Sequence, residues 1–218
     1  MRPTRNSALR NPLDYALGST ARTRVLRALA LHGGFVNVPG LVLAARVDPV
    51  SVRSALRDLE ALGLVETQGG PRSRLYHLSA RDTLSGPIRQ IFKREMARWS
   101  SLEDGLRLAA RELGPRPTAV WLFGSSARRE DVPQSDIDVM LVADEQHLAG
   151  HVQELRDRIW NVRSPLAKRA NVTGITEQEL LTLPRRHPRM WSNLRRDVIP
   201  LIGKMPDELL RELRGDAR

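Results

Sequence analysis

The sequence contains no cysteine, which excludes disulfide bonds and thiolate metal sites. No apolar run approaches the roughly 20 residues of a membrane-spanning helix, because arginine or another polar residue interrupts every candidate. The basic N-terminal stretch lacks the continuous apolar core of a secretory signal. Internal repeats and low-complexity tracts are absent as well. We therefore expect a globular, cytoplasmic protein without a membrane partner.

Positive charge is concentrated in the first third of the chain. The 218 residues carry a net charge of +10. Residues 1–80 contain 11 lysines and arginines against 5 acidic residues, whereas residues 116–218 contain 17 against 15. A basic segment attracts a polyanion such as nucleic acid by counterion release and long-range attraction. Composition alone leaves a second interpretation open, in which the arginines only provide solubility.

Residues 19–80 are predicted to form three short helices and a hairpin. The helices are expected over about 19–32, 38–46 and 49–62, and the strands over 64–67 and 74–78. Asp48 and Pro49 are a strong start for the third helix, since the carboxylate caps it and proline fits the first helical position. Apolar spacing turns four small or basic residues of this helix outward, which are Ser51, Arg53, Ser54 and Arg57.

This order of elements resembles a winged helix-turn-helix domain. The resemblance implies that the third helix enters the major groove, where small or basic residues let its backbone approach the base edges. Arg72 and Arg74 on the hairpin would reach phosphates or the minor groove. Double-stranded DNA is therefore the expected partner. Two alternatives stay open, because winged helices also serve as protein-interaction or dimerisation modules, and exposed arginines can be merely solvated.

A helical connector is predicted between two domains. Residues 83–113 have the apolar pattern of one helix, or of two helices broken near Ser100 and Ser101. A stripe of this kind is typical of a core or a dimer interface, so a homodimer through the 83–113 helices is one expectation. The predicted organisation is a flexible arm over 1–18, a winged helix over 19–80, a connector over 81–115 and a second domain over 116–218.

The sharpest chemical signal lies in the second domain. An apolar strand is predicted over 118–123 and a buried strand over 137–142, so side chains in the second strand alternate between two faces. Asp136 and Asp138 then project together, and two adjacent carboxylates repel each other unless a cation neutralises them. Oxygen ligands suit Mg²⁺ or Mn²⁺. The turn Gly124-Ser125-Ser126, after the first strand, can offer N–H groups and hydroxyls to phosphate oxygens.

Together these motifs resemble the minimal nucleotidyltransferases of the DNA polymerase β superfamily. The resemblance implies an α+β fold with a mixed sheet and flanking helices, following the winged helix and the connector. It implies that Asp136 and Asp138 are catalytic metal ligands. It also assigns a nucleoside triphosphate, with ATP expected, as substrate or ligand of five residues: Gly124, Ser125, Ser126, Arg128 and Ser135. The reaction would transfer an NMP group to a hydroxyl acceptor in a metal-dependent step.

One departure from the superfamily pattern leaves catalysis open. Active members usually present a third carboxylate from the next long strand, and Asn171 stands where that acid is expected. Asparagine can ligate a metal through its amide oxygen, but it cannot act as a base. The two-acid form resembles a subset in which a winged helix precedes the domain and which is generally regarded as regulatory. The alternative function is therefore a transcriptional regulator whose inactive domain senses a nucleotide or holds a partner.

Overall fold

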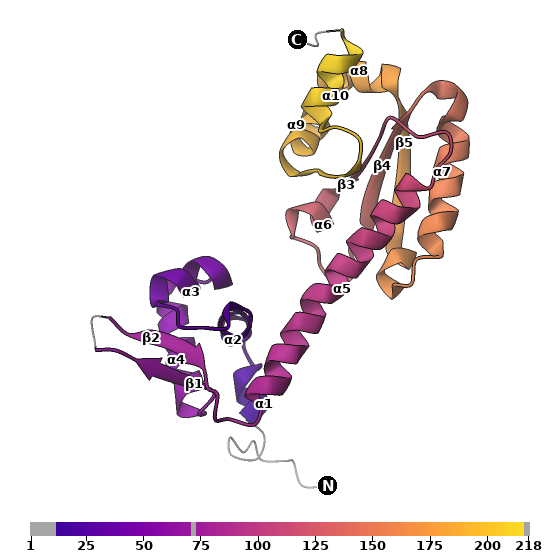
Figure 1. Ribbon diagram of the computed structural model, residues 1–218. Coiled ribbons are helices and arrows are strands. Elements are labelled where there is room, and N and C mark those ends of the chain that lie inside the picture. Colours follow the sequence, from indigo (N-terminus) through magenta and orange to yellow (C-terminus); the bar gives the residue numbers. More distant parts are fainter. Residues whose placement is uncertain (1–11, 71–72, 216–218) are drawn as a thin grey trace. The chain divides into compact units, whose positions relative to one another are not determined.

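The computed structural model describes residues 12–70 and 73–215 and separates the chain into two compact units (Figure 1). The first unit ends at Ala97 and the second begins at Arg98. The fold is α+β, as expected. Most of the predicted N-terminal arm lies outside the described residues. Its described part contains a short helix, α1 (Pro12–Ala16).

Within the first unit, residues 20–78 form three helices followed by a hairpin, as predicted. The elements are α2 (Thr20–His32), α3 (Val38–Ala45), α4 (Pro49–Ala61), β1 (Val65–Gln68) and β2 (Leu75–Leu78). Strands β1 and β2 pair antiparallel. Side chains fix the helix starts, because Ser19 Oγ accepts the Arg22 N–H at 3.2 Å and the Asp48 carboxylate accepts the Ser51 N–H at 2.9 Å.

One apolar core joins the elements of the first unit. The predicted inward residues of α4 are all buried in it: Val52, Ala55, Leu56 and Leu59. A backbone bridge between Val36 and Tyr76 ties the segment before α3 to the hairpin. Leu31 is 38% exposed, because Val25, Leu26, Leu29 and Ala30 form the inward face of α2.

The long helix α5 (Ser85–Arg111) is continuous through Ser100 and Ser101. Its first half contributes Ile88 and Phe92 to the core of the first unit. Its second half contributes Leu102 and Leu106 to a core of the second unit. The predicted connector over 81–115 is therefore divided between the two units.

A four-stranded mixed sheet organises the second unit. Its strands are β3 (Ala119–Phe123), β4 (Ile137–Ala143), β5 (Ala170–Thr176) and β6 (Ile199–Ile202), in the order β5-β4-β3-β6. Strands β4 and β5 run parallel, and the other pairs are antiparallel. The parallel pair needs a crossover connection, which α7 (Glu145–Trp160) and the short 3-10 helix η1 (Pro165–Arg169) provide.

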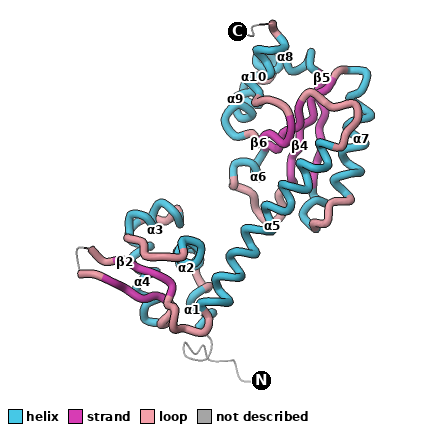
Figure 2. The backbone as a smooth tube through the Cα atoms, viewed as in Figure 1, coloured by secondary structure: helices cyan, strands magenta, loops and turns pink. Residues whose placement is uncertain are grey.

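Both faces of this sheet are covered (Figure 2). Val139 and Leu141 of β4 pack with α7 and the second half of α5. Met140 and Val142 point to the opposite face, which is covered by α8 (Glu177–Arg186), α9 (Pro188–Asp197) and α10 (Pro206–Leu213). This alternation decides which face each polar residue of the strand occupies. Within the described ranges, no helix has the length and apolarity to cross a membrane.

Candidate functional site

The Gly-Ser segment follows β3 and lies beside β4, the strand that contains Asp138. The helix α6 (Gly124–Arg128) begins where β3 ends, so a single short helix replaces the predicted turn. Phe123, the last residue of β3, is the antiparallel register partner of Asp138 in β4. Sheet pairing therefore brings together the Gly-Ser and Asp-x-Asp motifs, in which Gly124 and Asp138 are 14 residues apart.

Gly124 packs against the carboxylate of Asp138. Its φ of +77° lies in the left-handed region, which disfavours residues with a Cβ. A Cβ added at this position would overlap Asp138 Oδ2 and lie 3.2 Å from Asp138 Cγ. Both the backbone conformation and the space thus require glycine here.

Asp136 and Asp138 flank a residue that faces the core. Ile137 is 5% exposed and packs on the α5 and α7 face, so alternation directs Asp138 to the other face. Asp136 is exposed and precedes the strand, whereas Asp138 is half-buried within it. No side chain in the described part of the chain forms an ion pair or hydrogen bond with either carboxylate. Two unpaired oxygen ligand groups of this kind fit a hard divalent cation.

Asn171 is the neighbour of Asp138 on the adjacent strand. The two residues are register partners in the parallel pair of β4 and β5, and so their side chains share one face of the sheet. Asn171 is exposed. Among the residues that the structure describes, no three histidine, cysteine or acidic side chains are grouped to hold a metal ion. A cation at this place would accordingly have two carboxylates and at most an amide from the protein.

Hydrogen bonds hold the loop that leads into Asp136. Ser135 closes a turn, because its N–H donates to the Val132 carbonyl and its hydroxyl accepts the Val132 N–H, each at 2.9 Å. Arg169 donates to the carbonyl of Ser135. The buried hydroxyl of Ser126 donates to the carbonyl of Asp136 at 3.4 Å. The guanidinium of Arg169 therefore contacts the backbone of this loop.

Arg128 already has an acidic partner. Its Nε donates to Glu130 at 2.8 Å, and its side chain is 29% exposed. On α9, the hydrogen bond from Arg196 lowers the pKa of Asp197, and the charges of Arg196 and Arg128 lower it further. A phosphate at Arg128 would have to compete with Glu130.

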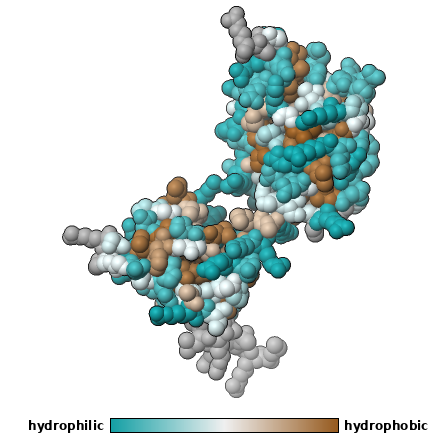
Figure 3. All heavy atoms as spheres, viewed as in Figure 1, coloured by the Kyte–Doolittle hydropathy of each residue, from teal (hydrophilic) through white to brown (hydrophobic). Residues whose placement is uncertain are grey.

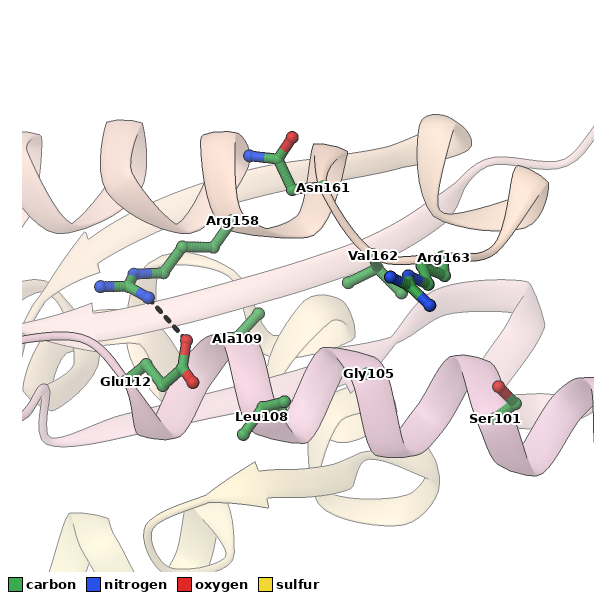
Figure 4. Close-up of a pocket in the computed structure, with 9 residues that line it drawn as sticks. All are labelled: Ser101, Gly105, Leu108, Ala109, Glu112, Arg158, Asn161, Val162 and Arg163. Atoms are coloured by element: carbon green, nitrogen blue, oxygen red, sulfur yellow. Dashed lines mark hydrogen bonds and ion pairs between the residues drawn. The ribbon is translucent and has the colours of Figure 1, made fainter.

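A cavity of about 460 Å³ lies on the opposite face of the sheet (Figure 4). Residues of α5 and of the end of α7 line it, among them Gly105, Leu108 and Val162. Arg158 donates to Glu112 at 2.7 Å across it. Since Asp138 faces the α8 to α10 side of the sheet, this cavity is separate from the acidic site.

The outward face of α4 differs slightly from its prediction. Arg53, Ser54 and Arg57 are exposed, as expected, and the exposed stripe also includes Val50. Ser51 is half-buried and belongs to the helix cap. Hydrogen bonds from its side chain and its backbone lower the pKa of Asp48. The Ser51 side chain therefore lies close to the Asp48 carboxylate.

A groove of about 710 Å³ lies within the first unit between the start of α3, α4 and β2. Arg53 and Arg74 both line it, together with Asn37. Arg74 is exposed, and Arg72 lies outside the described residues. Two arginines predicted to bind DNA thus border one groove, which is a suitable arrangement for a polyanion.

Three solved structures show weak similarity to the chain. A toxin-antitoxin with AMP-PNP is 15% identical with a TM-score of 0.33, and the match covers 52% of this chain and 85% of that one. Human N-acetylserotonin methyltransferase with SAM is 17% identical with a TM-score of 0.26, over 50% of this chain and 37% of that one. TrmBL2, an archaeal chromatin protein described with a novel mode of DNA binding, is 16% identical with a TM-score of 0.28, over 84% and 75%. With every TM-score below 0.5, none of these structures supports an inference about this chain.

The comparison with protein families is more specific. No curated protein matches the sequence. Residues 103–181 match the family model described as a nucleotidyltransferase domain. The matched range includes Gly124, Asp136, Asp138 and Asn171. Residues 103–181 of the second unit are therefore similar to a nucleotidyltransferase domain.

Proposed function

We propose that this chain is a DNA-binding protein whose second unit binds a nucleoside triphosphate with Mg²⁺ or Mn²⁺ and transfers an NMP group to a hydroxyl acceptor. The observation that carries the nucleotide part is the packing of Gly124 on Asp138 within the matched domain. This packing places a segment able to contact phosphates beside two carboxylates that have no basic partner among the described residues.

Each residue of the proposed site has a separate task. Asp136 and Asp138 would hold the cation, which when bound would supply positive charge for the triphosphate and the leaving pyrophosphate. Ser125 is half-buried in α6, and in the described part of the chain its hydroxyl has no hydrogen-bond partner, so it is available to a phosphate oxygen. Ser126 and Ser135 fix the loop before Asp136. In the transfer, the acceptor oxygen would bond to the α-phosphorus while the bond from that phosphorus to pyrophosphate breaks. The electron pair of the broken bond would leave with pyrophosphate, and the proton of the hydroxyl would pass to water.

The enzyme is tested by incubation with α-labelled ATP, Mg²⁺ or Mn²⁺, and DNA, RNA or a cell extract as acceptor. Metal-dependent incorporation of label is the expected result. Asp136→Ala and Asp138→Ala should each abolish it. Persistent absence of incorporation under all these conditions rejects the transferase.

A specific observation favours a second candidate function. Asn171 is the strand neighbour of Asp138 and cannot accept the proton of an attacking hydroxyl. The domain would then bind a nucleotide without turnover, and the protein would be a transcriptional regulator that senses the nucleotide. Metal-dependent ATP binding by calorimetry, with no transfer to any acceptor, is the result that distinguishes this candidate.

DNA binding by the first unit is supported by charge and shape. Arg53 and Arg74 line a groove of the first unit, and Arg57 follows Arg53 by one helical turn on the exposed stripe. Binding to a duplex of mixed sequence is expected to weaken as salt rises, because phosphate contacts release counterions. Salt-independent binding, or none, would reject this part of the proposal.

Two exposed apolar side chains of α5 in the first unit support self-association. Ile91 is 54% exposed and Met96 is 57% exposed, although both are large and apolar. We propose a homodimer through this helix. Sedimentation velocity should show a dimer that the Ile91→Lys/Met96→Lys variant dissociates, and a monomeric wild type at all concentrations would reject the dimer.

A further inference from the structure

The exposed stripe of α4 begins with an apolar side chain, Val50. Val50, Arg53, Ser54 and Arg57 are spaced by three, four and seven residues, so they share one helix face, and all four are exposed. Val50 is the second residue of the helix and is 74% exposed. Apolar patches also interrupt the hydrophilic surface of the first unit in Figure 3. A valine so placed is available to a partner that approaches the start of α4.

The guanidinium of Arg53 lies at the same end of the helix. Its Nη1 donates to the carbonyl of Pro49 at 3.3 Å, so the side chain folds back toward the first turn, where Val50 stands. This contact uses one of the five N–H donors of the guanidinium. The start of α4 therefore presents two methyl groups next to a planar set of hydrogen-bond donors.

The acidic residues of α4 and of its cap each have a hydrogen-bond or ion-pair partner. Asp48 accepts the N–H groups of Val50 and Ser51 as the helix cap. Asp58 pairs with Arg22 at 3.4 Å, and Glu60 accepts the hydroxyl of Thr67. The charge of the stripe itself is wholly positive, and this favours a nucleic acid over a protein surface as the occupant.

The major groove of DNA offers the chemical complement to these groups. Guanine presents two acceptors, O6 and N7, that match the fork of an arginine, and the C5 methyl of thymine is the apolar feature of the groove. We propose that Val50 and Arg53 read two neighbouring base pairs together, Val50 through a pyrimidine C5 methyl and Arg53 through a guanine. This inference rests on the proposed DNA binding of the first unit and adds the class of sequence that it prefers.

The test begins with the full-length protein and a pool of random duplexes, from which bound sequences are selected. The enriched sequences should share a guanine next to a thymine. Each thymine of a selected duplex is then replaced by deoxyuridine, which removes only the methyl group. Loss of one methyl should weaken wild-type binding about fourfold, the value of one buried methyl group. Val50→Ala should bind the thymine and deoxyuridine duplexes equally.

Leu43→Ala is the matched control, because Leu43 is 81% exposed in the same unit but lies on α3, outside the stripe. It should keep the fourfold preference. If the wild type binds selected duplexes and no single methyl matters, or if Val50→Ala keeps the preference, this inference is wrong while DNA binding stands. If Val50→Ala changes only the oligomeric state, Val50 is a protein contact and the inference is also wrong. If no duplex binds at all, the proposed DNA binding itself fails.

Discussion

Gly124 leaves no room for a side chain, because the carboxylate of Asp138 occupies the space where a Cβ would stand. Gly124 is the first residue of α6, which follows β3, and Asp138 lies in β4, the antiparallel partner of β3. The strand register holds the Asp138 carboxylate beside the first residue of α6. A substitution at position 124 consequently tests the geometry of the proposed nucleotide site without removing any charged group.

Gly124→Ala should reduce metal-dependent nucleotide binding and also destabilise the second unit. The positive φ and the overlap with Asp138 predict a cost of about 1–3 kcal/mol in the free energy of unfolding. Thermal unfolding and calorimetric titration with ATP measure the two effects. Gly150→Ala is the control, since Gly150 lies in α7 with open space around its Cα. That variant should be more stable by up to about 1 kcal/mol and should bind ATP as the wild type does.

Asp138→Asn should weaken metal-dependent ATP binding by at least about tenfold, because even groups that only support metal ligands contribute that much. The same substitution removes one of two neighbouring negative charges. In metal-free buffer the variant should therefore unfold at the same temperature as the wild type or a higher one. A lower unfolding temperature without metal would indicate a structural role for the carboxylate, and would count against the cation site.

Asn171→Asp should distinguish the two candidate functions. The new carboxylate would share the sheet face of Asp138 on the neighbouring strand and would add both negative charge and a proton acceptor. If the missing acid limits catalysis, label transfer should rise while Asn171→Ser leaves it low. Tighter metal binding without any transfer would instead support the nucleotide-sensing regulator.

Arg57→Ala/Arg74→Ala should lower the salt dependence of duplex binding. Each lost phosphate contact is expected to reduce the slope of log K against log[salt] by about 0.9. Electrophoretic or fluorescence titrations at several salt concentrations measure the slope. Arg185→Ala/Arg189→Ala removes the same charge from exposed positions of the second unit and should leave the slope nearly intact. Equal effects of the two double variants would mean that only net charge matters.

Ser51→Ala should raise the pKa of Asp48. The hydrogen bonds from Ser51 lower this pKa below its usual 3.8, with the side-chain bond the largest cause. A lowered pKa in the folded state means that the stabilising contribution is present above the usual pKa and is lost as the pH falls through the folded value. The carboxyl carbon shift of Asp48, followed by NMR titration, should move toward the usual pKa in the variant. The pKa of Asp144, which His147 lowers on α7, should not change.

Local sequence signals predicted most of the elements. Asp48 caps α4 and Pro49 begins it, as predicted, because caps act through hydrogen bonds within three residues. Asp136, Asp138 and the strand that follows were likewise predicted from the alternation of apolar and polar side chains. Val50 was missed because the α4 prediction considered only polar outward residues. The contact between the Ser51 side chain and Asp48 depends on the conformation of the helix cap.

The sequence by itself determined the helices, the strands and the presence of the Gly-Ser and Asp-x-Asp motifs, since these follow from local hydrogen bonding and apolar periodicity. Only the tertiary structure decided that Gly124 lies against Asp138, that Asn171 stands beside Asp138, and that Arg53 and Arg74 border one groove. Those relationships depend on strand register and on packing between distant segments. Both are set by the burial of whole faces, and no short stretch of the chain encodes them.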